Sequence, residues 1–342
     1  MPVLYAEELR EFVGRIFRAV GASPEEADQV ARLLVEANLT GHDSHGIIRV
    51  PGYVNRVREG LIIPGAEMKI LHESPCLALV DGGWNFGQIV AWKAMELTIE
   101  KAACCGLGAV SVRRCGHVGR LADYTLLAAQ RNMIGFMTAS GHGRGRSVAP
   151  WGSNEAQLHT NPLSWAIPTG AEPLILDMST SVVAEGKVHV KRNLGEKLPP
   201  GWAFDAEGRP ATDPAAFYGP PRGALLPLGG LAGHKGFGLS LVVEALSGAL
   251  SGAGTTRDFG SIQGNALFIT AIDVAHFIPL EDFTSEIQTL ILRVKGSRPA
   301  DGPVLMPGEP ERIEKEKRMR EGIFIEEETW RQITNMAEEL VK

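Results

Sequence analysis

Residues 87–138 decide the fold of this chain, and they read GQIVAWKAMELTIEKAACCGLGAVSVRRCGHVGRLADYTLLAAQRNMIGFMT. Residues 87–103 and 121–131 have the apolar spacing and the length of helices. The short apolar runs at 109–112 and 134–138 are typical of strands. Strand and helix alternate, which predicts an α/β protein with a mixed or parallel sheet covered by helices.

The same pattern extends on both sides of this stretch. Further strands are predicted at 76–80, 163–167, 174–176 and 266–272, and a helix at 236–248. Residues 192–233 are rich in Gly and Pro and weakly periodic, so we expect a long irregular excursion there, as a lid or a dimer arm.

The two ends of the chain have helical patterns. Ser23 and Glu26 form a capping box with Pro24 at the first helical position, and helical spacing then continues to near Gly41. A second helix is predicted to begin at 44–48 and to end at residue 60.

We therefore expect three parts. Residues 1–67 form a helical N-terminal part, and residues 68–309 form a mixed-sheet part that binds cofactor and substrate. The charged helices of residues 310–342 pack back on the N-terminal part.

Composition excludes several classes of protein. A chain of 342 residues can build roughly two domains, and its net charge of −6 argues against a general nucleic-acid binder. The four cysteines form no CxxC pair, which favours a reducing compartment over a disulfide framework. The N-terminus lacks the pattern of a signal peptide, and no apolar run approaches a membrane span. We expect a cytoplasmic enzyme with no membrane partner.

Familiar nucleotide-binding and catalytic motifs are missing from the sequence. The glycines at 141, 143 and 145 do not have the GxGxxG spacing of a Rossmann fingerprint. Walker A, GxSxG and HExxH patterns are also absent. These general motifs alone therefore indicate an α/β enzyme and do not identify its chemistry.

The first constellation of chemistry-bearing residues is GHDSHGIIRVP at 41–51. His45 and Arg49 share a face if the turn between them is helical. A guanidinium can hold a carboxylate while an imidazole exchanges a proton with a neighbouring carbonyl, and Ser44 can orient that imidazole. The alternatives are that Ser44 is a helix cap and His45 a surface residue, or that His42 and His45 bind a metal, which lacks a third ligand.

The second and third constellations follow predicted strands. His117 lies in RRCGHVG at 113–119, between a strand and a helix, where α/β proteins bind ligands. HTNP at 159–162 and LDMSTS at 176–181 place small hydroxyls near the carboxylate of Asp177, which suits hydrogen bonds to a ribose or a catalytic His. Helix capping and turn formation are the alternative explanations.

The fourth constellation is GHKGFG at 233–238, which opens a predicted helix. Backbone amides at a helix start, together with Lys235, form a site suited to a pyrophosphate. An ordinary glycine-rich helix entry is equally consistent with this pattern.

These segments, taken in order, resemble the type-2 malate/L-lactate dehydrogenase family, which includes ureidoglycolate and sulfolactate dehydrogenases. The matching stretches are GHDSHGIIRVPGY, GHVGRLADY, HTNPLSWAIP, LILDMSTSVVAEGK, GHKGFGLSLVVEALSGALSG and LMPGE, and they span residues 41–309. The start and the helix entry are most like those of bacterial hydroxycarboxylate dehydrogenase B.

The resemblance implies a homodimer with a non-Rossmann cofactor domain and an NAD(P)-dependent exchange between 2-keto and 2-hydroxy acids, for which the L configuration is expected. It makes His45 the proton donor with Ser44 and Asp177 as relay partners, or else His117 the acid–base residue. Arg49 is the implied carboxylate ligand. Where relatives have Asn, this chain has Arg114, and an extra cation there suits a dicarboxylate or changes the role of His117.

The implied cofactor is NAD, with NADP as the alternative. The residues that the resemblance places at the cofactor are Ser140, Thr160, Asn161, Asp177, Met178, Ser179, His234, Lys235, Pro307, Gly308 and Glu309, and Thr160 and His117 also fall at the substrate.

Three other functions are weighed against this one. A cyclic imino-acid reductase would use the same Arg and His. A metal-dependent hydrolase or lyase would use His42, His45 and His117. A catalytically silent nucleotide sensor would bind NADH without turning over a keto acid.

Overall fold

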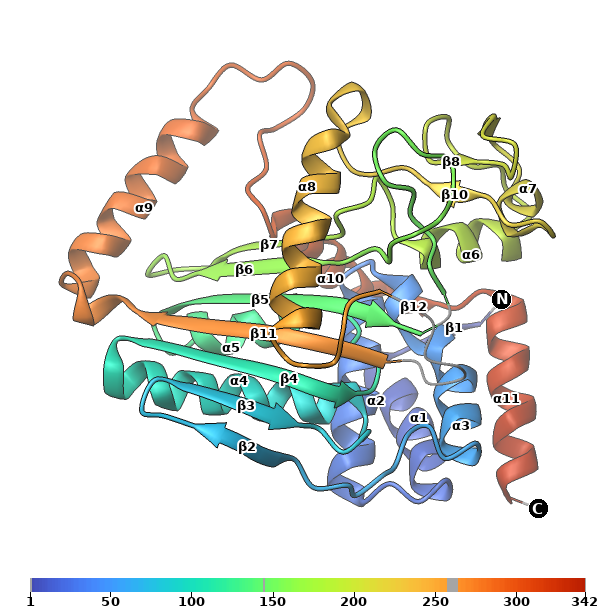
Figure 1. Ribbon diagram of the computed structural model, residues 1–342, viewed down its shortest axis with the longest axis horizontal. Helices are drawn as coiled ribbons and strands as arrows, with labels where there is room; N and C mark the ends of the chain where they lie inside the picture. The colour runs from blue at the N-terminus through green and yellow to red at the C-terminus, as the bar shows by residue number, and fades with distance from the viewer. Residues whose placement is uncertain (1, 144, 257–263, 342) are drawn as a thin grey trace.

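The computed structural model describes residues 2–143, 145–256 and 264–341, and its centre is a seven-stranded sheet (Figure 1). The strand order is β2-β3-β4-β11-β5-β6-β7, with β3 and β4 parallel and the other neighbouring pairs antiparallel. The strands are β2 (Lys69–Glu73), β3 (Leu77–Asp81), β4 (Leu107–Cys115), β5 (Met133–His142), β6 (Leu163–Ile167), β7 (Leu174–Met178) and β11 (Gly264–Asp273). The predicted mixed sheet is confirmed.

One face of the sheet is covered by α4 (Gly87–Cys105) and α5 (Ala122–Ala129), which lie behind it in Figure 1. Their apolar sides form the main core with β3, β4, β5 and β11. Two strand glycines allow the helices to approach closely. A Cβ on Gly108 would lie 2.2 Å from the Thr98 carbonyl oxygen of α4, and one on Gly135 would lie 2.6 Å from the Thr125 carbonyl oxygen of α5.

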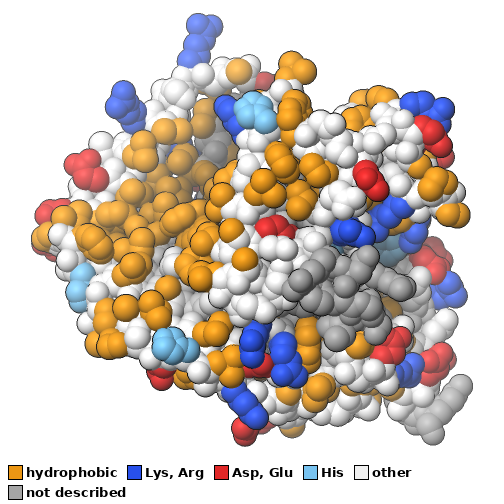
Figure 2. Space-filling view, in the orientation of Figure 1, with side chains coloured by type: hydrophobic (Ala, Val, Ile, Leu, Met, Phe, Trp, Pro, Cys, Tyr) orange, Lys and Arg blue, Asp and Glu red, His pale blue; other side chains and the backbone are white. Residues whose placement is uncertain are grey.

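The other face carries α8 (His234–Val243), which continues into a π-helical turn, η4 (Glu244–Ala249). This helix packs on β5, where the Ser247 and Thr138 hydroxyls are 2.7 Å apart. Beyond it the face is apolar and open, and Figure 2 shows hydrophobic side chains gathered between α8 and α9 (Leu280–Lys295). No residue of α9 is buried, and Leu292 is 71% exposed.

The two ends of the chain build one helical layer beside the sheet. β1 (Val3–Leu4) pairs with β12 (Ile323–Phe324), so the ends lie together. The helices of this layer are α1 (Ala6–Ala19), α2 (Pro24–Leu39), α3 (Val50–Arg58), α10 (Glu309–Glu321) and α11 (Glu327–Val341). Apolar residues of α1, α2, α3 and α11 form a second core with β12, whereas no residue of α10 is buried. The predicted capping box of α2 is present, because the Ser23 hydroxyl accepts a hydrogen bond from the Glu26 amide at 3.2 Å.

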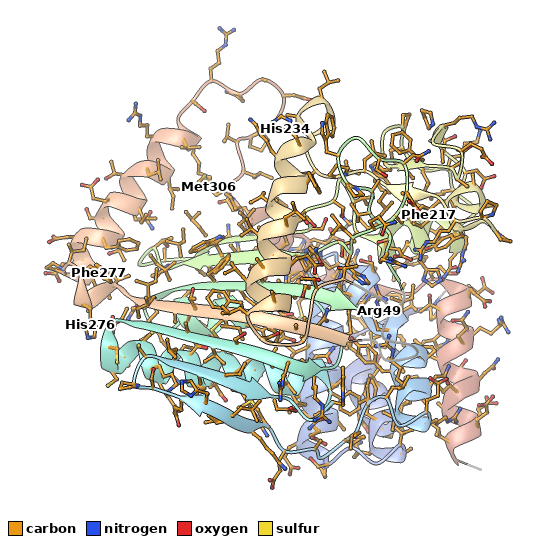
Figure 3. The ribbon with its side chains drawn as sticks, in the orientation of Figure 1. Arg49, Phe217, His234, His276, Phe277 and Met306 are labelled. Carbon is orange, nitrogen blue, oxygen red and sulfur yellow. The ribbon has the colours of Figure 1, made fainter. Side chains whose placement is uncertain are left out.

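Residues 192–233 contain more regular secondary structure than predicted. They add a small three-stranded sheet and a short helix, with a third apolar core around Phe217 (Figure 3). Helix α6 (Glu185–Asn193) leads into this region, whose own elements are β8 (Ala203–Phe204), β9 (Pro210–Ala211), α7 (Pro214–Tyr218), β10 (Ala224–Leu225) and η3 (Gly230–Ala232). The core is closed by segments outside the region, such as Val148 and Val188, which the local Gly and Pro content does not reveal.

The predicted strands and central helices agree with the structure to within a few residues. Elements that were not predicted include β2, α6, η5 (Val274–His276) and α9, as well as the short strands β1 and β12. Helix α9 has an amphipathic pattern that is present in its local sequence, although none of its residues is buried within the chain. Among the helices of the described ranges, none has the length and apolarity to cross a membrane.

We predict that Gly108→Ala destabilises the fold, because the new methyl group meets the backbone of α4. Forcing helix and strand apart costs about 1–3 kcal/mol in the free energy of unfolding, measured by urea denaturation. The control is Gly52→Ala in α3, where nothing lies within 4 Å of the new Cβ. That variant should be as stable as wild type, or more so. Equal stability of the two variants would contradict the close packing of α4.

Candidate functional site

The loop that follows α2 carries the first candidate residues. It forms two single 3-10 turns, η1 (Asp43–His45) and η2 (Ile47–Arg49), and α3 then begins at Val50. The predicted helix from 44–48 onward is therefore wrong at its start, because Gly46 is extended and separates the turns. His45 and Arg49 do not share one regular helix face and are instead placed by separate turns.

The side chain of Asn38 explains this loop. Its Oδ1 accepts a hydrogen bond from the Ile47 amide at 2.9 Å, and its Nδ2 donates to Asp43 at 2.7 Å. A Cβ on residue 46 would lie 2.1 Å from that Oδ1, so only glycine fits. Arg318 of α10 pairs with Asp43 at 2.7 Å from the other side. The loop is thus fixed by groups that lie outside its own motif.

His45 is half-buried at the edge of a cavity. Its Nδ1 lies 3.0 Å from the Ser44 hydroxyl, which fixes the ring orientation as predicted. Burial, and then the charge of Arg49, lower the pKa of His45 to about 3. The imidazole is therefore neutral near pH 7 and can accept a proton.

His117 lies next to His45, and the two rings are nearly parallel with centroids 5.8 Å apart. The Tyr53 hydroxyl is 2.7 Å from Nδ1 of His117 and accepts a hydrogen bond from Gln88 at 3.0 Å. This chain of hydrogen bonds favours the tautomer that carries its proton on Nε2. Burial, and then the charge of Arg49, hold the pKa of His117 well below its ordinary value.

Arg49 completes this cluster. Its Nε donates to the Ser44 carbonyl at 2.7 Å, which leaves its terminal nitrogens for a ligand. Helix α6 approaches from the far side at Gly186, where a Cβ would lie 2.9 Å from Nη2 of Arg49. A guanidinium held by its Nε presents its outer edge, which matches the two oxygens of a carboxylate.

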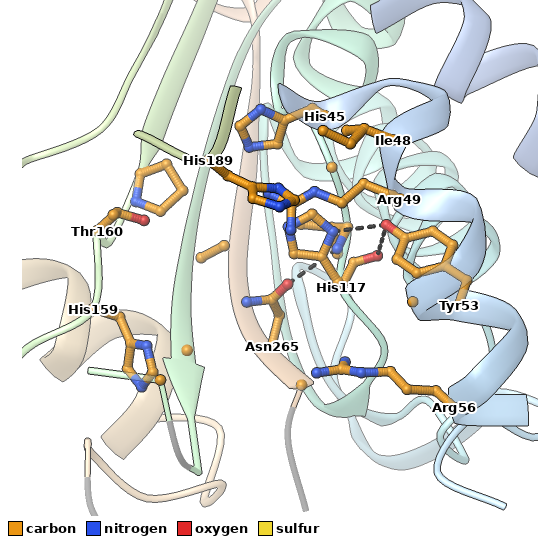
Figure 4. Close-up of a pocket in the computed structure, with 18 of the residues that line it drawn as sticks. His45, Ile48, Arg49, Tyr53, Arg56, His117, His159, Thr160, His189 and Asn265 are labelled. Carbon is orange, nitrogen blue, oxygen red and sulfur yellow. Dashed lines mark hydrogen bonds between the residues drawn. The ribbon is translucent and has the colours of Figure 1, made fainter. Parts of the chain in front are cut away.

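These side chains share one cavity of about 510 Å³, which we call the histidine cavity (Figure 4). It is also lined by Thr160 and Asn161, whose segment faces the two histidines across the cavity. The Asn161 amide nitrogen donates to Ser240 and to the buried Glu244, both at 2.9 Å. Its Oδ1 is buried and has no hydrogen-bond partner among the described residues, so it is available to a ligand.

Two further cavities continue from the histidine cavity. The middle cavity, of about 290 Å³, shares His45 and Thr160 with it and includes Asp177, Met178 and Ser179. The outer cavity, of about 370 Å³, is joined to the middle one through His42, Arg120 and Asp177. Pro307, Gly308 and Glu309 line its far side. We call the three cavities together the cleft.

Arg120 is the cation at the junction of the middle and outer cavities. Its Nη2 lies 2.5 Å from the Asp123 carboxylate, and both side chains are largely buried. Its Nε is buried without a hydrogen-bond partner in the part of the chain that the structure describes. A buried donor of this kind fits a phosphate or another anionic group in the cleft.

The structure gives Asp177 a partner other than the predicted one. Its carboxylate accepts a hydrogen bond from the Ala122 amide at 2.8 Å, at the start of α5. Of the expected relay from His45 through Ser44 to Asp177, only the contact between His45 and Ser44 is therefore present. Burial raises the pKa of Asp177, although the Ala122 amide and the Arg120 charge oppose this.

The remaining predicted cofactor residues lie outside the three cavities. His234 is at the end of α8 that points away from Arg49, with its ring 6.1 Å from that of Trp151 (Figure 3). Lys235 follows it on the same exposed turn. Ser140 is buried on β5, and its hydroxyl has no partner among the described groups. Within one chain, the predicted anion site at α8 is separate from the cleft.

Several site residues were missed by sequence reasoning. Tyr53, Gln88 and Asn38 act through contacts with segments far along the chain, so no local motif marks them. Arg56 was detectable in principle, because it lies three residues after Tyr53 and seven after Arg49 on one helix side.

The three histidines of the metal alternative have different contact partners. His42 contacts Glu311 at 3.6 Å, His45 contacts Ser44 and His117 contacts Tyr53. Of the described residues, no group of three has the geometry of a metal site.

Comparison with known proteins gives one consistent result. The family model of malate/L-lactate dehydrogenase matches residues 4–334. The malate dehydrogenase of Pyrococcus abyssi is 41% identical over 93% of this chain and 90% of its own length. Hydroxycarboxylate dehydrogenase B of Escherichia coli strain K12 is 34% identical over 98% of this chain and 93% of its own length.

The fold agrees with that result. The solved structure of malate dehydrogenase from Pyrococcus horikoshii OT3 has a TM-score of 0.89 and 35% sequence identity, and the match covers 99% of this chain and 95% of that one. The similarity therefore extends over the sheet, the helical layer and the cleft together.

We predict that His45 makes the protein less stable in acid. Its pKa is about 3 in the folded protein and 6.5 for an unperturbed imidazole, so below pH 6.5 protons bind preferentially to the unfolded chain. The stability is complete above pH 6.5 and is lost as the pH falls toward 3, by roughly 2 kcal/mol at pH 5. His45→Gln should therefore lose less stability than wild type between pH 7 and pH 5, measured by urea unfolding.

The matched control is His72→Gln on the exposed strand β2, which should follow wild type at both pH values. An equal loss of stability in His45→Gln and wild type would show that the pKa of His45 is not lowered in the folded protein.

Proposed function

This chain belongs to the malate/L-lactate dehydrogenase family, and from that premise we propose how its cleft carries out 2-hydroxy acid dehydrogenation. The observation that carries the proposal is the group of Arg49, His45 and His117 around one buried cavity. Arg49 supplies a guanidinium, and the lowered pKa values of both imidazoles favour their neutral forms. This is the arrangement needed to hold a carboxylate beside a group that exchanges a proton.

Arg49 binds the substrate carboxylate through its outer nitrogens, since its Nε is engaged by the Ser44 carbonyl. In the oxidation direction the neutral His45 accepts the hydroxyl proton, with Ser44 holding its ring. Binding of the carboxylate neutralises Arg49, whose charge lowers the pKa of His45. The bound substrate therefore makes His45 a stronger base at the time when it has to take the proton.

His117 supports the same oxygen of the substrate. With its proton on Nε2, it can donate a hydrogen bond to the hydroxyl or carbonyl group. The fixed contacts of Tyr53 and Gln88 hold that ring without a net charge. We assign His45 as the proton-exchanging residue and His117 as the polarising one, because only His45 has the Ser44 hydroxyl beside it.

We propose NAD as the cofactor, with NADP as the alternative. When bound, the nicotinamide accepts a hydride from C2 of the hydroxy acid or returns it to the keto acid. The cleft has a suitable shape and suitable polar groups: three joined cavities, the buried Nε of Arg120 as a donor and the buried Oδ1 of Asn161 as an acceptor. Arg120 would hold the phosphates, and Glu309 at the far end would face a ribose.

We also propose a homodimer. Apolar side chains are exposed to solvent on the open sheet face, on α8 and on α9, and they include Val242, Leu290 and Leu292. An exposed apolar patch of this kind is typical of a protein interface. A second copy would cover this face by symmetry.

The test of the function is oxidation of NADH and NADPH with pyruvate, oxaloacetate, 2-oxoglutarate and phenylpyruvate. We expect turnover of at least one keto acid by wild type. His45→Gln should lower kcat by about 10²- to 10⁴-fold, because proton exchange is lost. Arg49→Gln should mainly raise KM, because the carboxylate ligand is lost.

The control for these variants is His72→Gln on β2, which should match wild type. A His45→Gln enzyme as fast as wild type would rule out the assigned role. Faster reduction of Δ1-piperideine-2-carboxylate or Δ1-pyrroline-2-carboxylate than of every keto acid would favour the imino-acid reductase instead.

The dimer has a separate test. Sedimentation equilibrium should give twice the chain mass of 36.8 kDa. Val242→Glu with Leu292→Glu should shift the protein toward the single-chain mass, because a buried carboxylate opposes association. A wild-type protein that sediments at 36.8 kDa would contradict the homodimer.

A further inference from the structure

The surroundings of Asn161 are a part of the histidine cavity that the proposed function leaves unexplained. Asn161 is fully buried, and its φ of 38° lies in a backbone region that few residues other than glycine adopt. The Thr180 hydroxyl donates to the Asn161 carbonyl oxygen at 3.0 Å and holds this backbone in place. The side-chain amide of Asn161 therefore starts from a fixed point in the wall of the cavity.

Ser240 and Glu244 determine which end of that amide is directed away from them. They lie four residues apart on one side of the helix that α8 and η4 form. The Asn161 Nδ2 donates to the Ser240 hydroxyl and to Glu244 Oε1, both at 2.9 Å, and so uses both of its hydrogens. The amide oxygen is left in the cavity wall, buried and without a hydrogen-bond partner within residues 2–143, 145–256 and 264–341.

Glu244 permits only this orientation. Its carboxyl group accepts hydrogen bonds from the Thr256 amide at 2.8 Å and from the Thr256 hydroxyl, as well as from Asn161. If the Asn161 amide turned over, its oxygen would face Glu244 Oε1, and two acceptors would oppose each other. The Ser240 hydroxyl can bond to either end of an amide, so Ser240 alone would not exclude the reversed form.

Glu244 is an unfavourable choice for a contact that only supports the fold. Its side chain is 5% exposed, and burying a carboxyl group lowers stability unless its hydrogen bonds compensate. Glu244 is also the first residue of a π-helical turn, a rare geometry that is frequent at functional sites. A buried acceptor without a partner, such as Asn161 Oδ1, fits a site whose partner arrives with a ligand.

The reactants of the proposed function offer one suitable donor to Asn161. The C2 hydroxyl is bound by His45 in the oxidation direction and is absent from the keto acid, and an ionised carboxylate donates no hydrogen bond. The carboxamide of a nicotinamide carries an NH2 group in both redox states. Hydride transfer also requires the nicotinamide ring to lie next to C2 of the acid, and therefore in the histidine cavity.

We propose that Glu244 is a positioning residue for the cofactor: it holds the Asn161 amide so that Oδ1 accepts a hydrogen bond from the carboxamide NH2 group. The proposal rests on the proposed function, because it assumes a nicotinamide cofactor. It adds the residue that sets the polarity of this part of the wall, and Glu244 does so without touching either reactant.

The test compares two reduced dinucleotides by titration calorimetry, in the NAD or the NADP series, whichever wild type binds more tightly. One carries the natural carboxamide, and the other is the 3-acetylpyridine analogue, whose methyl ketone has no N–H group. Wild type should bind the natural cofactor about 10-fold more tightly, as expected for one hydrogen bond to a buried acceptor. Equal binding of the two by wild type would overturn the proposal.

Glu244→Gln keeps the size of the side chain but can donate to Asn161 Oδ1, so the Asn161 amide can turn over. The preference for the natural carboxamide should fall by about 5- to 10-fold. ADP-ribose, which has no nicotinamide, should bind as it does to wild type, whereas a merely structural role of Glu244 would weaken all three ligands alike. Glu11→Gln, an exposed change on α1, is the matched control and should keep the wild-type preference.

Exchanging the two groups separates orientation from structure. In the double variant Asn161→Asp with Glu244→Gln, the amide donates from position 244 and a carboxylate oxygen at position 161 still faces the cavity. The double variant should recover the wild-type preference, whereas Asn161→Asp alone places two carboxyl groups together and should be less stable. A double variant that binds ADP-ribose normally without recovering the preference would contradict the role of Glu244. This comparison also decides the question if Glu244→Gln alone does not fold.

The two proposals fail in different ways. If wild type turns over a keto acid but Glu244→Gln keeps the full preference for the carboxamide, the role of Glu244 is wrong and the dehydrogenase function stands. If NADH or NADPH binds but no keto or hydroxy acid is turned over, the proposed function is wrong, and the titrations still decide the role of Glu244. If neither dinucleotide binds, both proposals are wrong.

Discussion

The amide of Asn38 is the constraint on which the site depends. It occupies the space where residue 46 would have a Cβ, and it bonds to the segments on both sides of that glycine. The loop from 41 to 49 is therefore held as two short turns on the end of α2. Without this packing, the loop itself would not hold the side chains of Ser44, His45 and Arg49 at one cavity.

The constraint connects the site to both ends of the chain. Asp43 is bonded to Asn38 and also to Arg318 of α10, so the C-terminal helices support the loop. The pairing of β1 with β12 closes the same layer. The sheet contributes the opposite wall, because β6 and β7 carry the segments with Thr160 and Asp177 to the cleft. The site lies where these two layers meet, which is where ligand sites commonly form.

Electrostatics then gives the cavity its chemistry. Two half-buried imidazoles lie beside the Arg49 guanidinium, and lost hydration and that charge lower the pKa of each. A neutral imidazole can accept or share a proton, whereas an imidazolium beside Arg49 would add to an unbalanced positive charge. The arrangement is completed by an anionic ligand, so binding and proton exchange are coupled through the same guanidinium.

The sequence by itself determined the alternation of strands and helices over 87–138, the helical ends and the residues that bear the chemistry, because periodicity and side-chain type are local properties. It did not determine the partners of those residues. Asp177 bonds to Ala122 rather than to Ser44, His117 depends on Tyr53 and Gln88, and Gly46 is required by Asn38. Each of these contacts joins residues whose spacing in the sequence does not follow the period of a helix or a strand, so the sequence pattern does not predict it. Helix α9 is a different case, because its amphipathic period is local, and only the tertiary structure shows that its apolar side chains are not buried within the chain. Only the packing of the sheet against the helical layer decides which distant groups meet, and that packing depends on the shapes and volumes of many side chains at once.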